Sequence, residues 1–176
     1  MARIRWLVCA LMLAGAVPAW GGSQLPASIP RVRPLGQTAV LAFQRGIAHS
    51  PTFRDVVARL QRSDVVVYIS VEPRPPGKCP GATRFVSATR YNRFLHIVVD
   101  RRLAPKTMVA LLGHELQHAL EVADAPAIRD FEAFRQFYEH QGFHNEHMGT
   151  FDSRAARETG RRVRAELATP DFTSGG

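Results

Sequence analysis

The sequence predicts an α+β domain, in which a small antiparallel sheet carries a helix packed on it and is followed by C-terminal helices. The β-branched run VVVYISV at residues 65–71 is typical of a buried strand. Residues 83–89 and 94–99 are strand-like runs on either side of a turn near Tyr91 and Asn92, and they predict a hairpin. Segments with apolar residues at helical spacing lie before and after these runs. Strands and helices are therefore segregated along the chain, as in α+β folds.

Helices are predicted on both sides of the strands. Residues 38–48 form a short apolar helix, and the next helix has Ser50 as its N-cap and Pro51 at its first position. After the hairpin, Pro105 opens a helix over residues 106–123. Two further helices are expected at residues 127–140 and 153–168, the last of them with Ser153 as its N-cap.

The N-terminus has the pattern of a secretory signal peptide. Two arginines precede an apolar run from Trp6 to Val17, and small residues follow it. The run of about 12 residues is too short to span a bilayer, and no other stretch is apolar enough to do so. We expect a signal peptide at residues 1–21, a flexible linker at 22–36, one domain at 37–170 and a disordered tail at 171–176. The mature protein is then exported, to the periplasm or the medium.

The composition is that of a globular protein, with 45% hydrophobic and 22% charged residues. The formal net charge of +8 favours anionic partners. Basic residues are scattered, however, and the chain has no sequence module for nucleic-acid recognition, so no specific nucleic-acid partner is expected. Cys79 is the single cysteine after the signal peptide, which excludes an internal disulfide in the mature chain.

The stretch LLGHELQHALEVAD, residues 111–124, carries the chemistry. Its His-Glu-x-x-His order places His118 one helical turn beyond His114 and about 40° around the helix, so both imidazoles can bind one Zn²⁺ ion. Glu115 lies about 100° away, beside the metal, where it can accept a proton from zinc-bound water. The other face of the helix is apolar and can dock on the sheet.

This segment resembles the zincin metallopeptidases, in which an edge strand precedes and flanks the His-Glu-x-x-His helix. The resemblance implies that residues 93–100, RFLHIVVD, form this edge strand and pair with an extended peptide substrate. His96 within the strand is expected to be an ordinary strand residue. Residues 50–168 also resemble a group of small exported bacterial zincin-like proteins, through GHELQHALEVAD, FYEHQGF and FDSRAARETGRRVRAEL.

The third metal ligand is open between several acids, since catalytic zinc takes three protein ligands and one water. Asp124 has the spacing of a metzincin-like ligand, but Glu121 stands where that pattern needs a glycine. Glu132 and Glu139 lie on a later helix, as in gluzincin-like sites. Asp152 is preferred, because it matches the acid of the resembling group and begins a helix that can pack antiparallel to its predecessor.

Two neighbouring features have weaker assignments. Glu121 lies about 20° around the helix from His114 and is expected to hydrogen-bond an imidazole rather than bind the metal. The tract YEHQGFHNEHMG adds His140, His144 and His147, which are expected in a solvated loop. Tyr138 or one of these histidines is a candidate donor to the oxyanion of a tetrahedral intermediate.

The sequence thus predicts a zinc-dependent metallopeptidase that hydrolyses peptide bonds, with Zn²⁺ held by His114, His118 and Asp152 and water activated by Glu115. The substrate is expected to be a peptide or protein segment. The alternative is a non-catalytic zincin-like metal-binding module that binds an anionic envelope component. The sequence does not indicate the oligomeric state.

Overall fold

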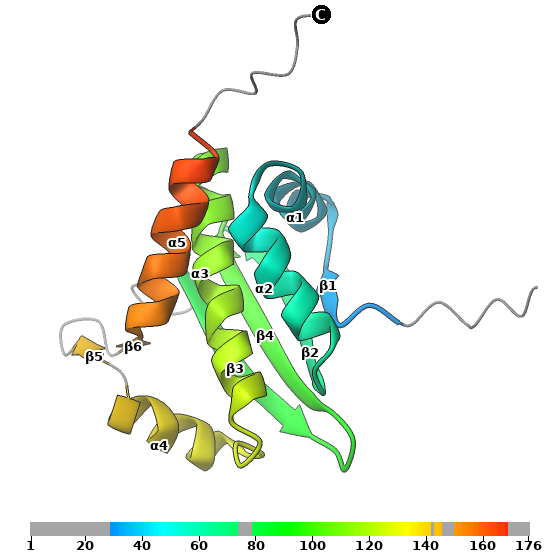
Figure 1. The fold of residues 1–176 in the computed structure, drawn as a ribbon, viewed down its shortest axis with the longest axis vertical. Coiled ribbons are helices and arrows are strands. Elements are labelled where there is room, and N and C mark those ends of the chain that lie inside the picture. The colour runs from blue at the N-terminus through cyan, green and yellow to red at the C-terminus, as the bar shows by residue number, and fades with distance from the viewer. Residues whose placement is uncertain (1–28, 74–78, 142, 146–149, 169–176) are drawn as a thin grey trace, which may run out of the picture.

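A computed structural model describes residues 29–73, 79–141, 143–145 and 150–168 (Figure 1). The expected signal peptide at 1–21, the first part of the expected linker and the expected tail at 171–176 lie outside these residues. Within the described ranges, none of the helices has the length and apolar character needed to cross a bilayer.

The described residues form the predicted series of helices and strands, together with three short strands, at residues 32–34, 143–145 and 150–152, that the sequence did not predict. In chain order the elements are β1 (Val32–Pro34), α1 (Gln37–His49), α2 (Pro51–Gln61), β2 (Val65–Glu72), β3 (Gly81–Ala88), β4 (Arg93–Asp100), α3 (Pro105–Asp124), α4 (Phe131–Gln141), β5 (Phe143–Asn145), β6 (Thr150–Asp152) and α5 (Arg154–Glu166). The side chains of Ser50 and Ser153 cap α2 and α5, and each accepts a hydrogen bond from the backbone N–H three residues later. Both predicted caps are confirmed.

The main sheet is mixed, with the strand order β1-β2-β4-β3. The predicted hairpin of β3 and β4 is confirmed, but the prediction of an antiparallel sheet is wrong, because β2 runs parallel to both β1 and β4. After β2 the chain leaves one strand position empty and forms β3 at the edge of the sheet, and β4 then fills the position between β2 and β3. The chain reverses direction from β2 to β3 and again from β3 to β4, so β2 and β4 run in the same direction. The near-continuous apolar run of β2 fits such a strand in the interior of the sheet.

Two element boundaries differ from the sequence prediction. Val32–Pro34 form β1, within the stretch expected to be a linker, and Val32 is only 4% exposed against the sheet. The helix expected from residue 127 begins at Phe131. Its start is set by Asp130, whose carboxylate accepts a hydrogen bond from the backbone N–H of Ala133 at 2.8 Å.

The helix α3 lies on the sheet between α2 and α5 (Figure 1). The apolar face of α3 is buried, as predicted, and it includes Leu112, Leu116 and Leu120. These side chains share one core with Leu95 and Ile97 of β4. The core therefore fixes the rotation of α3 about its axis, and with it the direction in which the opposite face points.

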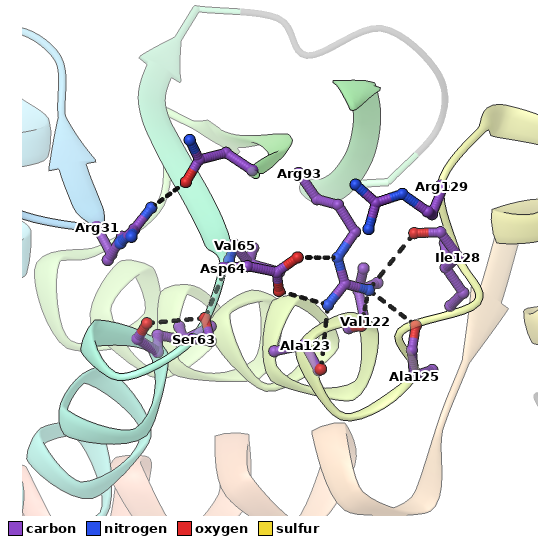
Figure 2. Close-up of polar contacts among 12 residues, drawn as sticks. Arg31, Ser63, Asp64, Val65, Arg93, Val122, Ala123, Ala125, Ile128 and Arg129 are labelled. Atoms are coloured by element: carbon purple, nitrogen blue, oxygen red, sulfur yellow. Dashed lines mark hydrogen bonds and ion pairs between the residues drawn. The ribbon is translucent and has the colours of Figure 1, made fainter. Parts of the chain in front are cut away.

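The C-terminal end of α3 is anchored by Arg93, the first residue of β4 (Figure 2). Arg93 is 1% exposed, and its guanidinium makes two hydrogen bonds to the carboxylate of Asp64, at 2.9 and 2.6 Å. It also donates to backbone carbonyls at and beyond the end of α3, those of Val122, Ala123, Ala125 and Ile128. A buried positive charge thus satisfies carbonyls that the helix end leaves without partners.

Candidate metal centre

His114 and His118 lie one turn apart on the face of α3 that turns away from the sheet core. Their rings approach edge to face, with centroids 4.9 Å apart. His118 is buried and His114 is largely covered. The predicted helix and spacing therefore bring both imidazoles to one place.

Asp152 completes the cluster from the residue that precedes the N-cap of α5. Its Oδ1 atom lies 3.4 Å from Nε2 of His114 and 3.8 Å from Nε2 of His118. One ligand atom from each of the three residues lies within 4.8 Å of the others. The structure thus brings together the three residues that the sequence predicts as a ligand set.

These distances fit a metal centre better than direct hydrogen bonds. Hydrogen bonds between nitrogen and oxygen are about 2.7–3.2 Å long, shorter than both separations between the carboxylate and the imidazoles. Ligands bound to tetrahedral zinc at about 2.0–2.2 Å are about 3.3–3.6 Å apart, so the 3.4 Å separation lies within this range and the 3.8 Å separation is slightly longer. Two imidazole nitrogens and one carboxylate oxygen are also a donor set that zinc accepts, with a fourth position left for water.

Glu121 lies behind His118 and orients it. Its Oε2 atom is 3.0 Å from Nδ1 of His118, which leaves Nε2 directed at Asp152. The other oxygen of Glu121 accepts a hydrogen bond from the hydroxyl of Ser153. The contact with an imidazole is the one expected for Glu121 from the sequence.

Ser153 links the two acids of the cluster. Its hydroxyl donates to Glu121 and caps α5, where it accepts from the backbone N–H of Ala156 at 2.9 Å. Its backbone N–H donates to Oδ1 of Asp152 at 2.7 Å. The start of α5 is therefore tied to α3 through Glu121, and Asp152 is held in its orientation.

Tyr138 of α4 also supports His118. Its buried hydroxyl lies 3.1 Å from the backbone oxygen of His118 and 3.1 Å from Oε2 of Glu121. Because the phenol hydrogen points into this network, these contacts favour a supporting role for Tyr138 over that of an oxyanion donor. Burial, and then the charge of Glu121, raise the pKa of Tyr138.

Two glycines allow α5 to approach α3 closely enough for Asp152 to reach the histidines. A Cβ atom at Gly113 would lie 2.9 Å from Cγ2 of Val163, and one at Gly160 would lie 3.2 Å from Cβ of His114. Both positions are therefore filled by the opposite helix. The presence of Gly113 in a helix, which costs about 1 kcal/mol relative to alanine, follows from this contact.

Glu115 is 4% exposed and lies between α3 and β3. Its Oε2 atom accepts a hydrogen bond from the hydroxyl of Thr83 at 2.8 Å, and the same hydroxyl lies 3.1 Å from the backbone oxygen of Glu115. No local sequence pattern indicates a role for Thr83, because only the position of β3 beside α3 brings it there.

The two histidines have opposite pKa shifts. Burial lowers the pKa of His114, and the neighbouring His118 lowers it further. Burial also disfavours the charged form of His118, but the hydrogen bond to Glu121 and the charge of Glu115 outweigh it and raise the pKa of His118. The pKa of Glu121 is lowered despite its burial, mainly by its hydrogen bond to His118. A metal ion bound at Nε2 of His118 would therefore compete with a proton.

The other acids considered as third ligand lie elsewhere. Asp124 is 62% exposed and forms an ion pair of 3.1 Å with Arg59. Glu132 and Glu139 both pair with Arg135 on the exposed side of α4. The pairing of these acids with arginines follows from the fold, and the sequence spacing did not reveal it.

The strand that flanks α3 at the sheet edge is β3, so the expectation that residues 93–100 form the edge strand is wrong. The strand β4 is paired on both sides, because the chain forms the edge before it returns to the interior of the sheet. His96 of β4 lies 2.9 Å from the hydroxyl of Ser70. It is not among the residues of the metal cluster.

The histidine-containing tract is described only in part. His140 is exposed, and its Nδ1 atom lies 2.7 Å from the backbone oxygen of Gln136, one turn earlier in α4. The side chain of His144 and the whole of His147 lie outside the described residues. The expectation that one of them donates to an oxyanion therefore stays a prediction.

Comparisons with known proteins give no relative: no family model matches the chain, and neither a curated protein nor a solved structure matches it significantly. Fold and site together define an α+β protein with a candidate His-His-Asp metal centre, formed by the central helix and the start of the last one.

Proposed function

We propose that the protein is a zinc metallopeptidase of the zincin type. The observation that carries the proposal is the cluster of His114, His118 and Asp152, whose ligand atoms lie within 4.8 Å of one another. The buried side chain of Glu115 lies on the same turn of α3 as the two histidines. Zinc bound by these three residues would act as a Lewis acid and lower the pKa of water, which is the chemistry that peptide hydrolysis needs.

Glu115 is the proposed general base. The hydrogen bond from Thr83 holds one carboxylate oxygen, so the side chain keeps a single orientation beside the histidines. In the reaction Glu115 accepts a proton from the attacking water and returns it to the leaving amine. Glu121, Ser153 and Tyr138 keep His118 in position and do not touch the substrate.

An extended peptide is the proposed substrate, bound along β3. This strand forms the edge of the sheet beside α3 and runs antiparallel to its neighbour. The backbone groups on its outer side are suited to pair with another extended chain. In zincins an edge strand flanks the His-Glu-x-x-His helix, and we assign this role to β3. The signal-peptide pattern supports the further proposal that the protein acts in the periplasm or the medium.

The test is metal content and cleavage in the mature protein. Wild-type protein is expected to hold about one equivalent of zinc and to cleave denatured casein. Glu115→Gln should keep the zinc and lose about 100-fold or more of the cleavage rate. Glu139→Gln, a change of the same kind on the exposed side of α4, should alter neither. Full zinc content without cleavage of casein or of a mixed peptide library would overturn the peptidase and favour a non-catalytic metal-binding module.

A further inference from the structure

A groove with a volume of about 720 Å³ lies beside His114, between α3 and α5. On one side it is lined by apolar residues, among them Leu103, Ala110 and Leu111. His114 is part of its lining, so the groove lies next to one of the proposed ligands of the metal centre. Gly160 also lines the groove, and its lack of a side chain lets α5 lie close to His114.

The opposite side of the groove is formed by four arginines of α5. Arg154, Arg157, Arg161 and Arg164 all line it, and all are exposed. Their spacing of three, four and three residues places them within an arc of about 80° on the helix surface. No aspartate or glutamate is among the lining residues that the structure describes. The groove is therefore apolar on one side and strongly positive on the other.

Two of these guanidinium groups, those of Arg154 and Arg164, carry charge that the described part of the protein does not pair. Arg161 shares the carboxylate of Glu158 with Arg162. Nε of Arg157 lies 3.7 Å from Oδ2 of Asp152, which is itself a proposed metal ligand.

We propose that this groove is a specificity pocket that binds aspartate or glutamate side chains of the peptide substrate, next to the scissile bond. This inference rests on the proposed peptidase function. Guanidinium groups bind carboxylates through paired, charge-assisted hydrogen bonds, and four of them facing one groove supply this in more than one register. The apolar wall accommodates the aliphatic part of such side chains. The groove's described lining contains no phenylalanine, tyrosine or tryptophan on which successive nucleic-acid bases could stack, and its one imidazole, that of His114, is a proposed metal ligand.

Arg161 and Arg162 offer a matched pair of variants. Both are exposed, both pair with Glu158, and they are adjacent in α5, but only Arg161 lines the groove. Arg161→Ala and Arg162→Ala therefore remove the same charge and the same kind of surface ion pair. Only the first change alters the groove.

Cleavage is measured on internally quenched peptides that differ only in Glu and Asp versus Gln and Asn around one scissile bond. Wild-type protein should cleave the acidic peptide with a kcat/KM about tenfold higher than that of the amide peptide. Arg161→Ala should lower this preference several-fold, and Arg154→Gln with Arg164→Gln should abolish it. Arg162→Ala should keep it. Equal cleavage of both peptides, or equal loss in Arg161→Ala and Arg162→Ala, overturns the proposal.

Binding separates this inference from the peptidase function. The acidic and amide peptides, labelled with a fluorophore, are titrated with the zinc-loaded Glu115→Gln protein, and anisotropy is recorded. Tighter binding of the acidic peptide that depends on Arg161 supports the pocket, even if wild-type protein cleaves nothing and the peptidase proposal fails. Cleavage of both peptides without any difference in binding leaves the peptidase intact and overturns the pocket.

Discussion

Oε2 of Glu121 lies 3.0 Å from Nδ1 of His118, on the side of the imidazole opposite to the nitrogen that faces Asp152. The contact assigns the two ring nitrogens separate tasks: Nδ1 bonds to the carboxylate, and Nε2 is left for a metal. A carboxylate in this position also makes the imidazole a stronger base and a better ligand. The same Glu121 accepts a hydrogen bond from Ser153, the residue after Asp152, so one side chain positions two proposed ligands.

Glu121→Ala is expected to weaken zinc binding by about 10–100-fold, the usual effect of losing a partner behind a ligating histidine. The change releases Nδ1 of His118 and the hydroxyl of Ser153 together. Zinc affinity is measured by competition with a chromophoric chelator. Glu139→Ala on the exposed side of α4 serves as control and should bind zinc like the wild type. Unchanged affinity in Glu121→Ala would show that the hydrogen bond does not support the metal site.

Asp152→Ala should reduce zinc affinity by more than about 100-fold. This loss is larger than that expected when a residue that only hydrogen-bonds a ligand is removed. Asp124→Ala tests the competing sequence interpretation and should leave zinc affinity unchanged, since Asp124 pairs with Arg59 on the surface. Equilibrium dialysis against buffered zinc gives both values. A larger loss in Asp124→Ala than in Asp152→Ala would reverse the assignment of the third ligand.

The sequence predicts the helical half of the site well, because the spacing of His114, Glu115 and His118 sets their positions once a helix forms. Asp152 is more than thirty residues further along the chain, and its approach depends on the packing of α5 against α3. Gly113 indicates in the sequence that another segment packs closely against this helix, but only the fold shows that the contacting residue is Val163. No local pattern indicates a role for Thr83. The four arginines of α5 do recur at helical spacing, but only the fold shows that they face a groove beside His114.

The fold shows the same division between local and distant information. Helix caps at Ser50 and Ser153 and the hairpin of β3 and β4 depend on neighbouring residues, and all were predicted. Strand order depends on contacts between distant segments. The parallel pairing of β2 with β4, and the position of β3 at the edge, therefore could not be derived from local patterns.

Gly113→Ala is expected to destabilise the protein by about 1–3 kcal/mol, although alanine is the better helix former. The added methyl group would lie 2.9 Å from Cγ2 of Val163, a separation that requires the helices to move apart. Val163→Ala removes the clashing atom, so the double variant should lose less stability than the two single losses predict. Urea unfolding of all four proteins tests this. Additive losses would mean that the two residues do not limit the approach of α5.

Arg93→Leu should lower the free energy of unfolding by about 3 kcal/mol. The substitution leaves the carboxylate of Asp64 and the carbonyls at the end of α3 without the partner shown in Figure 2. Arg59→Ala is the control, because its exposed ion pair with Asp124 contributes at most about 1 kcal/mol. A loss in Arg93→Leu as small as that of the control would show that water replaces the guanidinium at this position.

The ion pair of Asp64 with Arg93 also predicts a pH dependence of stability. Hydrogen bonding to Arg93 lowers the pKa of Asp64 in the folded protein, against a smaller opposing effect of burial. A lowered folded-state pKa means that the unfolded chain binds the proton more readily. The stabilisation is thus fully present above the ordinary aspartate pKa of about 4, and it is lost as the pH falls through the folded-state value.

Asp64→Asn removes this contribution. The difference in unfolding free energy between wild type and Asp64→Asn should be constant above about pH 5 and shrink below about pH 4. Urea unfolding across this range measures it. In the Arg93→Leu background, Asp64→Asn should produce a much weaker pH dependence, because the group that lowers the pKa is gone. A difference that grows toward acid pH in the wild-type background would contradict the direction of the pKa shift and the role of Arg93 as its cause.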